Sequence, residues 1–155
     1  MLAQASVSEL SARFLFCLEL SASCTSVVSG GSLAMRRDAP APSDEVALLE
    51  RALDGEGEVY ASGIILQELL QGFSGPKAAE SIVERFGALP MLVPETTDHV
   101  RAAALRNECR RKGMQIGTID ALIAQLTIRY ELQLLTSDRD FYHLAEHVPL
   151  TLATS

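Results

Sequence analysis

The sequence predicts an α/β fold in which helices cover both faces of a parallel sheet. Short apolar runs alternate with amphipathic helical segments along the chain, and this alternation is typical of parallel strands joined by crossover helices. The chain has 155 residues, 48% of them hydrophobic, which is enough for one domain with a single core. Its net charge of −7 argues against unspecific coating of nucleic acid, because phosphate binding needs clustered basic residues.

Each predicted element follows from a local pattern. Strands are predicted where short apolar runs lie between turn residues, at residues 14–20, 58–61, 91–93 and 132–135. Helices are predicted where apolar residues recur at helical spacing, at residues 32–37, 44–53, 63–71, around 78–83, 97–112 and 116–130. Capping residues support several helix ends, with N-caps at Ser43, Ser62 and Thr97 or Asp98, and stops at Gly55, Gly72 and Gly113.

The helix predicted over residues 116–130 has one carboxylate on its apolar side. At 100° per residue, its polar residues Thr118, Gln125 and Arg129 form one stripe that is predicted to face water. Asp120 lies opposite this stripe, so it points toward the protein and needs a partner or a proton. An alternative is that Asp120 is an acid of the first helical turn, which the helix dipole favours.

Two further acids are predicted to approach Asp120. Glu68 borders the apolar face of the helix after one strand, and Asp138 directly follows another strand. Because the C-terminal ends of parallel strands share one sheet edge, where ligands bind, the three acids can converge there. Each acid alone also has a structural explanation, as a helix cap, a salt bridge or an Asx turn.

A cluster of carboxylates favours a bound cation, since like charges held close together repel one another. Oxygen ligands without Cys or His select hard ions, here Mg²⁺ or Mn²⁺. Such ions suit phosphoryl transfer, in which the metal activates a water molecule and stabilises charge on the phosphate. The sequence therefore favours a metal-dependent reaction on a phosphate ester.

A basic stretch ends the helix predicted over residues 97–112. Arg110, Arg111 and Lys112 either contact RNA or only stabilise the helix C-terminus through its dipole, and the sequence leaves both explanations open. The three cysteines are odd in number and lack metal-site spacing, which indicates reduced thiols in a cytoplasmic protein. No apolar run approaches the length of a membrane span, and no export signal is recognised, so we expect no membrane association.

Three motifs resemble those of PIN-domain ribonucleases of the VapC toxin type. They are VYASGIILQELLQG, RRKGMQIGTIDALIAQ and LQLLTSDRDFYHL, and they occur in the family's order. The resemblance implies a three-layer α/β/α PIN domain over residues 32–155 and Mg²⁺- or Mn²⁺-dependent endoribonuclease activity. It also implies an RNA substrate, a cognate antitoxin protein as partner and a homodimer.

Site residues follow from this resemblance, residue by residue. Glu68, Asp120 and Asp138 correspond to the family's catalytic, metal-binding acids, and Asp140 to a supporting acid. Ser62, Thr136 and Ser137 are then supporting polar residues, and Thr136, or Ser137 beside it, holds a ligand carboxylate or a metal-bound water.

The chain departs from the family pattern at its first strand. Family members begin with an apolar strand that ends in Asp-Thr-Ser or Asp-Ser-Ser, whose Asp binds the metal, and this triplet is absent here. Glu19, which follows an apolar run, is the candidate replacement, whereas Cys24 before Thr25 and Ser26 would place a thiol there.

We hypothesise that the atypical residues 1–31 arise from a shifted reading frame or an altered gene start. Sequencing the gene tests this, and an adjacent frame without an apolar strand ending in an acid would contradict it. The missing acid also raises a second functional hypothesis, a catalytically impaired PIN-domain protein that retains only antitoxin binding. A flavodoxin-like phosphoacceptor domain is a third, which no phosphoacceptor loop in the sequence supports.

Overall fold

One parallel sheet organises the protein. The computed structural model describes residues 12–16, 44–71 and 76–153. In it the sheet has five strands in the order β3-β2-β1-β4-β5, and every neighbouring pair is parallel. The strands are β1 (Ala12–Phe16), β2 (Gly57–Ser62), β3 (Met91–Leu92), β4 (Gln133–Leu135) and β5 (Thr151–Leu152).

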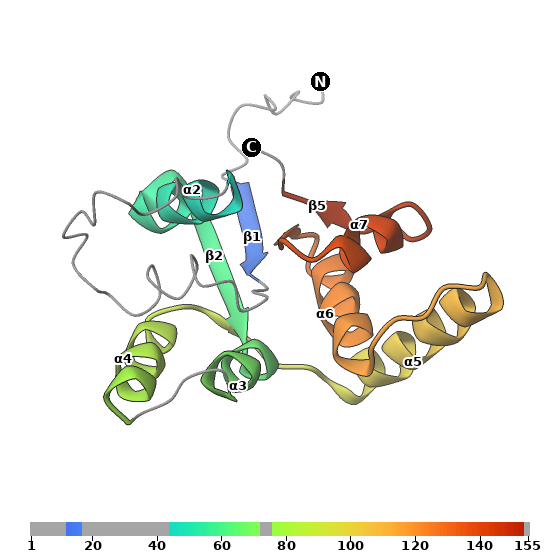
Figure 1. Cartoon of the computed structure of the whole chain (residues 1–155), viewed down its shortest axis with the longest axis horizontal. Coiled ribbons are helices and arrows are strands. Elements are labelled where there is room, and N and C mark those ends of the chain that lie inside the picture. The colour runs from blue at the N-terminus through green and yellow to red at the C-terminus, as the bar shows by residue number, and fades with distance from the viewer. Residues whose placement is uncertain (1–11, 17–43, 72–75, 154–155) are drawn as a thin grey trace, which may run out of the picture.

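The helices lie in two layers that enclose this sheet. From β1 the chain moves outward through β2 to β3, then returns to β4 and β5 on the other side of β1. Right-handed crossovers in opposite directions put the two sets of connecting helices on opposite faces, and Figure 1 shows the two groups apart. The helical segments are α2 (Asp44–Arg51) with its continuation η2 (Ala52–Glu56), α3 (Gly63–Gln71), α4 (Pro76–Gly87), α5 (Thr96–Arg111), α6 (Thr118–Arg129) and α7 (Arg139–Ala145). The predicted three-layer α/β/α fold with a parallel central sheet is confirmed.

Strand β1 occupies the middle of the sheet. Its Leu15 lies beside Tyr60 of β2 and Leu134 of β4. The strand predicted at residues 14–20 is therefore present, but it begins two residues earlier and ends at Phe16. The candidate acid Glu19, the alternative Cys24 and the helix predicted at residues 32–37 lie outside the described residues.

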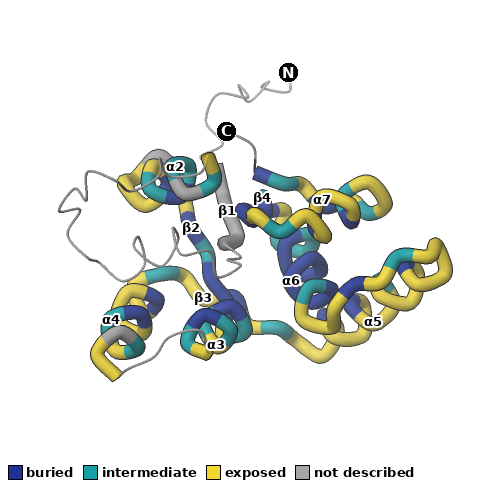
Figure 2. The backbone as a smooth tube through the Cα atoms, viewed as in Figure 1, coloured by how far each residue is buried: buried dark blue, intermediate teal, exposed yellow. Residues whose placement is uncertain are grey.

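The core is aliphatic, as the composition predicts. Ile123, Ala124 and Leu126 of α6 and Leu134 of β4 are all 0% exposed. Burying a large aliphatic side chain contributes about 1.5–3 kcal/mol, so α6 is a major stabilising element. Figure 2 shows most residues of α6 as buried, whereas α5 is exposed over most of its length. Cys109 is a buried free thiol, whereas Cys17 and Cys24 lie outside the described residues.

The polar stripe of α6 faces water only in part, because Thr118 is exposed, as predicted, whereas Gln125 is buried and Arg129 is partly buried. Gln125 is only 7% exposed. Arg129 bonds to Asp98 of α5, and Thr118 lines a cavity together with residues of α5. A polar side of one helix becomes an interior surface when a second helix supplies matching polar groups, and periodicity within α6 does not reveal that second helix.

Several helix ends differ in detail from the sequence prediction. Gly55 ends the α2–η2 segment with a positive φ of 103°, which glycine adopts without a steric penalty. Glu95, rather than Thr97 or Asp98, is the N-cap of α5. The short elements α7 and β5 were not predicted, because a few residues carry little periodicity. No helix in the described ranges combines the length and the apolar character of a membrane span.

Candidate functional site

The C-terminal ends of β2 and β4 lie on either side of β1, at the point where the chain reverses its direction across the sheet. Ligand sites in open parallel sheets form at such a reversal. At the end of β2, the fully buried Ser62 accepts a hydrogen bond on Oγ from the N–H of Ile65 at 3.4 Å. Ser62 is thus the predicted N-cap of α3, and it fixes where that helix leaves the sheet edge.

Glu68 lies on α3, about one and a half turns after this cap, and it is half-buried. Partial burial raises the pKa of the Glu68 carboxyl above its ordinary value, and the negative charge of Asp120 raises it further. The two acids therefore come from different elements and lie within electrostatic reach of each other.

Asp120 is the third residue of α6 and is also half-buried. Its Oδ2 accepts the backbone N–H of Gly117 at 3.1 Å, so the first-turn explanation of this acid describes a real contact. Burial nevertheless raises the pKa of Asp120, and the charges of Asp138 and Asp140 add to the rise, while the Gly117 hydrogen bond opposes it. The hydrogen bond at the helix terminus is therefore too weak to cancel the rise in the pKa of Asp120.

Asp138 and Asp140 belong to one tight turn after β4. Asp138 is the N-cap of α7, and its Oδ1 accepts the N–H of Asp140 at 2.8 Å. The N–H of Asp138 donates to Oγ1 of Thr136 at 3.1 Å, and Thr136 is only 3% exposed. Thr136 therefore holds the turn that carries both acids, whereas Ser137 is exposed.

Gly117 is a determinant of the site that sequence reasoning missed. A Cβ atom at this position would collide with the Asp120 carboxylate, which lies directly over the Gly117 backbone. The backbone angles of Gly117, φ −64° and ψ 159°, are open to any residue, so a larger residue there would act by displacing the Asp120 carboxylate from its present position. The sequence does contain the corresponding pattern, a glycine three residues before Asp120 near the start of the predicted helix.

The four acids have the donor chemistry for a hard divalent cation, but their ligand set is incomplete in the described part of the chain. No ion pair joins Glu68, Asp120, Asp138 or Asp140 to a described basic side chain. Among the described residues, no three acidic, histidine or cysteine side chains lie close enough together to hold one metal ion. The acids influence each other's charge without closing around a common point, and their role as metal ligands stays a prediction.

The predicted RNA contacts at the end of α5 differ in their surroundings. Nζ of Lys112 forms an ion pair with Glu108 at 2.8 Å. Lys112 lowers the pKa of the Glu108 carboxyl most, and Arg111 lowers it to a smaller extent. Arg110 instead lines a cavity with Arg106. Two of the three predicted cations thus lie beside an acid of their own helix.

Comparison with known proteins agrees with this fold. The family model described as PIN domain matches residues 26–147. No curated protein matches the chain in sequence.

Solved structures with the same fold include VapBC proteins of low sequence identity. VapBC2 from Rickettsia felis, bound to a DNA fragment from its promoter, is 22% identical, with 90% of this chain and 97% of that chain covered and a TM-score of 0.62. VapBC-1 from nontypeable Haemophilus influenzae is 16% identical, with 91% and 96% covered and a TM-score of 0.60. DNA-bound VapBC from Salmonella typhimurium is 23% identical, with 92% and 97% covered and a TM-score of 0.58. The family model spans most of the chain, and the protein therefore belongs to the PIN domain family.

Proposed function

We propose that the protein is a metal-dependent endoribonuclease, the toxin of a toxin–antitoxin pair. The observation that carries this proposal is that Asp120 lies within electrostatic reach of acids from two other parts of the chain, Glu68 on α3 and Asp138 after β4. Burial and mutual repulsion raise the pKa of Glu68 and of Asp120, and no described basic residue pairs with either acid. An arrangement that is unfavourable without a cation supports a site that binds one.

Each acid has a distinct part in this proposal. Glu68, Asp120 and Asp138 would hold a Mg²⁺ or Mn²⁺ ion, and Asp140 would support them from the next turn. The ion would supply an activated water and stabilise negative charge on the phosphodiester. Gly117 fixes the Asp120 carboxylate through its N–H, and Asp140 fixes the Asp138 carboxylate through its own N–H, while the Thr136 hydroxyl accepts the backbone N–H of Asp138.

The proposed partner is a small antitoxin protein. The similar solved structures are VapBC proteins, and those from Rickettsia felis and Salmonella typhimurium are bound to DNA. By this likeness, we propose that the chain also pairs with an antitoxin. The resemblance of its motifs to the VapC type supports a homodimer, and its cysteine usage supports a cytoplasmic location.

A second candidate function is a catalytically impaired PIN-domain protein that retains only antitoxin binding. Its supporting observation is the absence, among the described residues, of three ligands that could close around one ion. The missing Asp of the first-strand motif points in the same direction.

Cleavage of RNA by the purified protein with Mn²⁺ or Mg²⁺ tests the first proposal. We expect cleavage that EDTA removes and that Asp120→Ala lowers by about 100-fold or more, as loss of a catalytic group does. Asp54→Ala is the matched control, because Asp54 is an exposed acid on η2.

Equal cleavage by the wild type and Asp120→Ala would contradict the nuclease mechanism. No cleavage by either form, together with retained binding of the antitoxin, would favour the impaired relative.

A further inference from the structure

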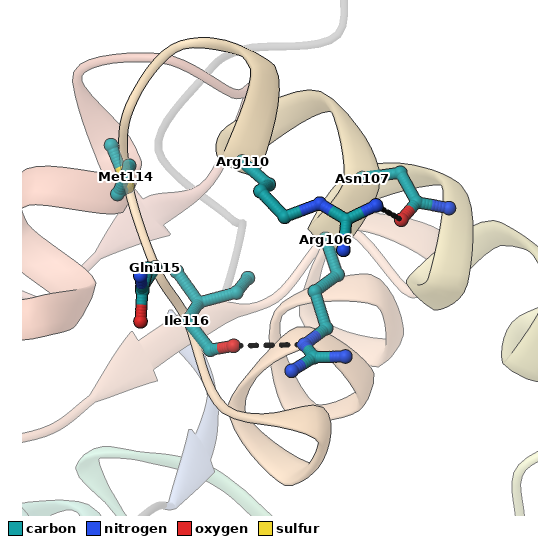
Figure 3. A pocket seen from close by; sticks show the side chains of 6 residues that line it. All are labelled: Arg106, Asn107, Arg110, Met114, Gln115 and Ile116. Carbon is teal, nitrogen blue, oxygen red and sulfur yellow. Dashed lines mark hydrogen bonds between the residues drawn. The ribbon is translucent and has the colours of Figure 1, made fainter.

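A cavity of about 270 Å³ lies between α5 and the segment that leads into α6. Figure 3 shows its lining side chains, which are Arg106, Asn107, Arg110, Met114, Gln115 and Ile116. Its polar lining consists of two guanidinium groups and two side-chain amides, with no acid among the lining residues. In a protein with a net charge of −7, this is a local concentration of positive charge.

Arg106 is held in place by the backbone of the opposite wall. Its Nε donates to the carbonyl oxygen of Ile116 at 3.0 Å, as the dashed line in Figure 3 shows. Among the described residues, neither Nη nitrogen of Arg106 has a hydrogen-bond acceptor. The guanidinium is therefore oriented by one nitrogen, while its other two remain available to a ligand.

Arg110 lies one turn further along α5 and is held only by a neutral group. Its Nη2 donates to Oδ1 of Asn107 at 3.4 Å. No described carboxylate pairs with Arg110, in contrast to Lys112, which pairs with Glu108. The full charge of Arg110 thus remains available in the cavity.

The wall of this cavity continues into the acid site. Ile116, whose carbonyl holds Arg106, precedes Gly117, whose N–H holds the Asp120 carboxylate. A polyanion cannot approach a cluster of acids through charge attraction to them, so cations beside the cluster must draw it in. Planar guanidinium groups bind phosphate through paired N–H donors, which makes arginine the suitable residue for this task.

We propose that the cavity between Arg106 and Arg110 is a phosphate subsite that binds the backbone of single-stranded RNA beside Asp120. This inference rests on the proposed nuclease function, and it names the residues that hold the substrate. Arg106 contributes an oriented pair of donors, Arg110 contributes charge, and Asn107 and Gln115 contribute neutral polar groups. Arg111 and Lys112 do not line this cavity, and Lys112 forms an ion pair with Glu108.

Binding of a short fluorescent single-stranded RNA in EDTA tests the proposal, since binding is then measured without cleavage. The variant is Arg106→Gln with Arg110→Gln, and the matched control is Arg101→Gln with Arg111→Gln, which removes the same charge from the same helix. We expect the first double variant to bind RNA several-fold more weakly. The dependence of log K on log salt should become shallower by about 0.7 for each phosphate that the variant no longer neutralises, as for single strands generally.

Equal weakening in both double variants would overturn the subsite, because binding would then follow net charge alone. Unchanged RNA binding in the Arg106/Arg110 variant would overturn it as well. Arg110→Gln alone keeps the Arg106–Ile116 bond, so a smaller shift in the same direction, with unchanged thermal unfolding, excludes misfolding as the cause.

The same measurements separate this inference from the nuclease proposal. Wild-type protein that binds RNA through the two arginines but cleaves none with Mn²⁺ would remove the nuclease function and keep the subsite. Cleavage that depends on Asp120, with normal RNA binding by the Arg106/Arg110 variant, would do the opposite.

Discussion

Asp98 and Asp120 occupy equivalent positions in two neighbouring helices but lie in opposite electrostatic environments. Each is the third residue of its helix, and each accepts the backbone N–H of the residue before the helix, from Glu95 at 2.8 Å and from Gly117 at 3.1 Å. Asp98 is 0% exposed, and Nη1 of Arg129 bonds to it at 2.5 Å. Asp120 is half-buried, and the charges that affect its pKa are those of other acids.

Arg129 is the group that makes the environments of Asp98 and Asp120 differ, because it pairs with Asp98. It also bonds to Glu95 at 2.7 Å and lies over the Tyr130 ring, 5.0 Å from the ring centroid. Glu95 and then Asp98 raise the pKa of Arg129, so its charge is permanent. A buried carboxylate with a fixed guanidinium partner is a structural tie between α5 and α6. The same helical position without a cation leaves a charge that a ligand can satisfy.

The largest expected effect is on stability, and it comes from removing Arg129, the ion-pair partner of Asp98. Arg129→Met leaves Asp98 buried and without its ion-pair partner, and breaking a buried pair from one side is strongly destabilising. We expect Tm to fall by on the order of 10 °C, as measured by circular dichroism. Adding Asp98→Asn should recover part of this loss, because the amide oxygen still accepts the Glu95 N–H and no buried charge remains. A double variant no more stable than Arg129→Met would argue against the ion pair as the cause.

The next largest effect is expected from displacing the Asp120 carboxylate without changing its charge. Gly117→Ala places a methyl group where the Asp120 carboxylate lies, although the backbone angles suit alanine. We expect a loss of cleavage of about 100-fold, the scale that a displacement of about 1 Å can cause in a catalytic group. The free energy of unfolding should change by only about 1 kcal/mol.

Gly63→Ala is the control for this change, because a Cβ there meets nothing within 4 Å. Full cleavage by Gly117→Ala would show that the position of Asp120 is unimportant to the reaction.

The smallest expected effect is on the dependence of stability on pH. The pKa values of Asp120 and Glu68 are raised in the folded protein, so between their ordinary and raised values the folded state binds more protons than the unfolded state. The contribution is therefore favourable at acidic pH, and it is lost as pH rises from about 4 through the raised values.

Urea unfolding at several pH values measures this contribution. Asp120→Asn should stabilise the protein at pH 7 by about 0.5–1 kcal/mol and flatten the fall in stability with rising pH. Asp54→Asn, at an exposed acid, should leave the pH profile unchanged. A profile that is the same for Asp120→Asn and the wild type would contradict the repulsion between the acids.

Much of the fold follows from local patterns that the sequence displays. The predicted bounds 63–71 coincide with those of α3, because Ser62 provides a cap and the apolar residues repeat at helical spacing. A rule of parallel sheets predicts that the acids approach one sheet edge, and this prediction needs only the order of the elements. Gly117, by contrast, is explained only by a contact in space, and α7 and β5 are too short for a pattern to identify.

The sequence by itself determined the alternation of strands and helices, the family and the acids that follow the strands, because caps and periodicity act over a few residues. The tertiary structure decided which acid is paired and which remains open for a ligand. Asp98 and Arg129 are 31 residues apart, and their contact exists only because α5 and α6 pack together. Local patterns put Asp98 and Asp120 at the same position in a helix, and long-range packing placed a cation beside only one of them.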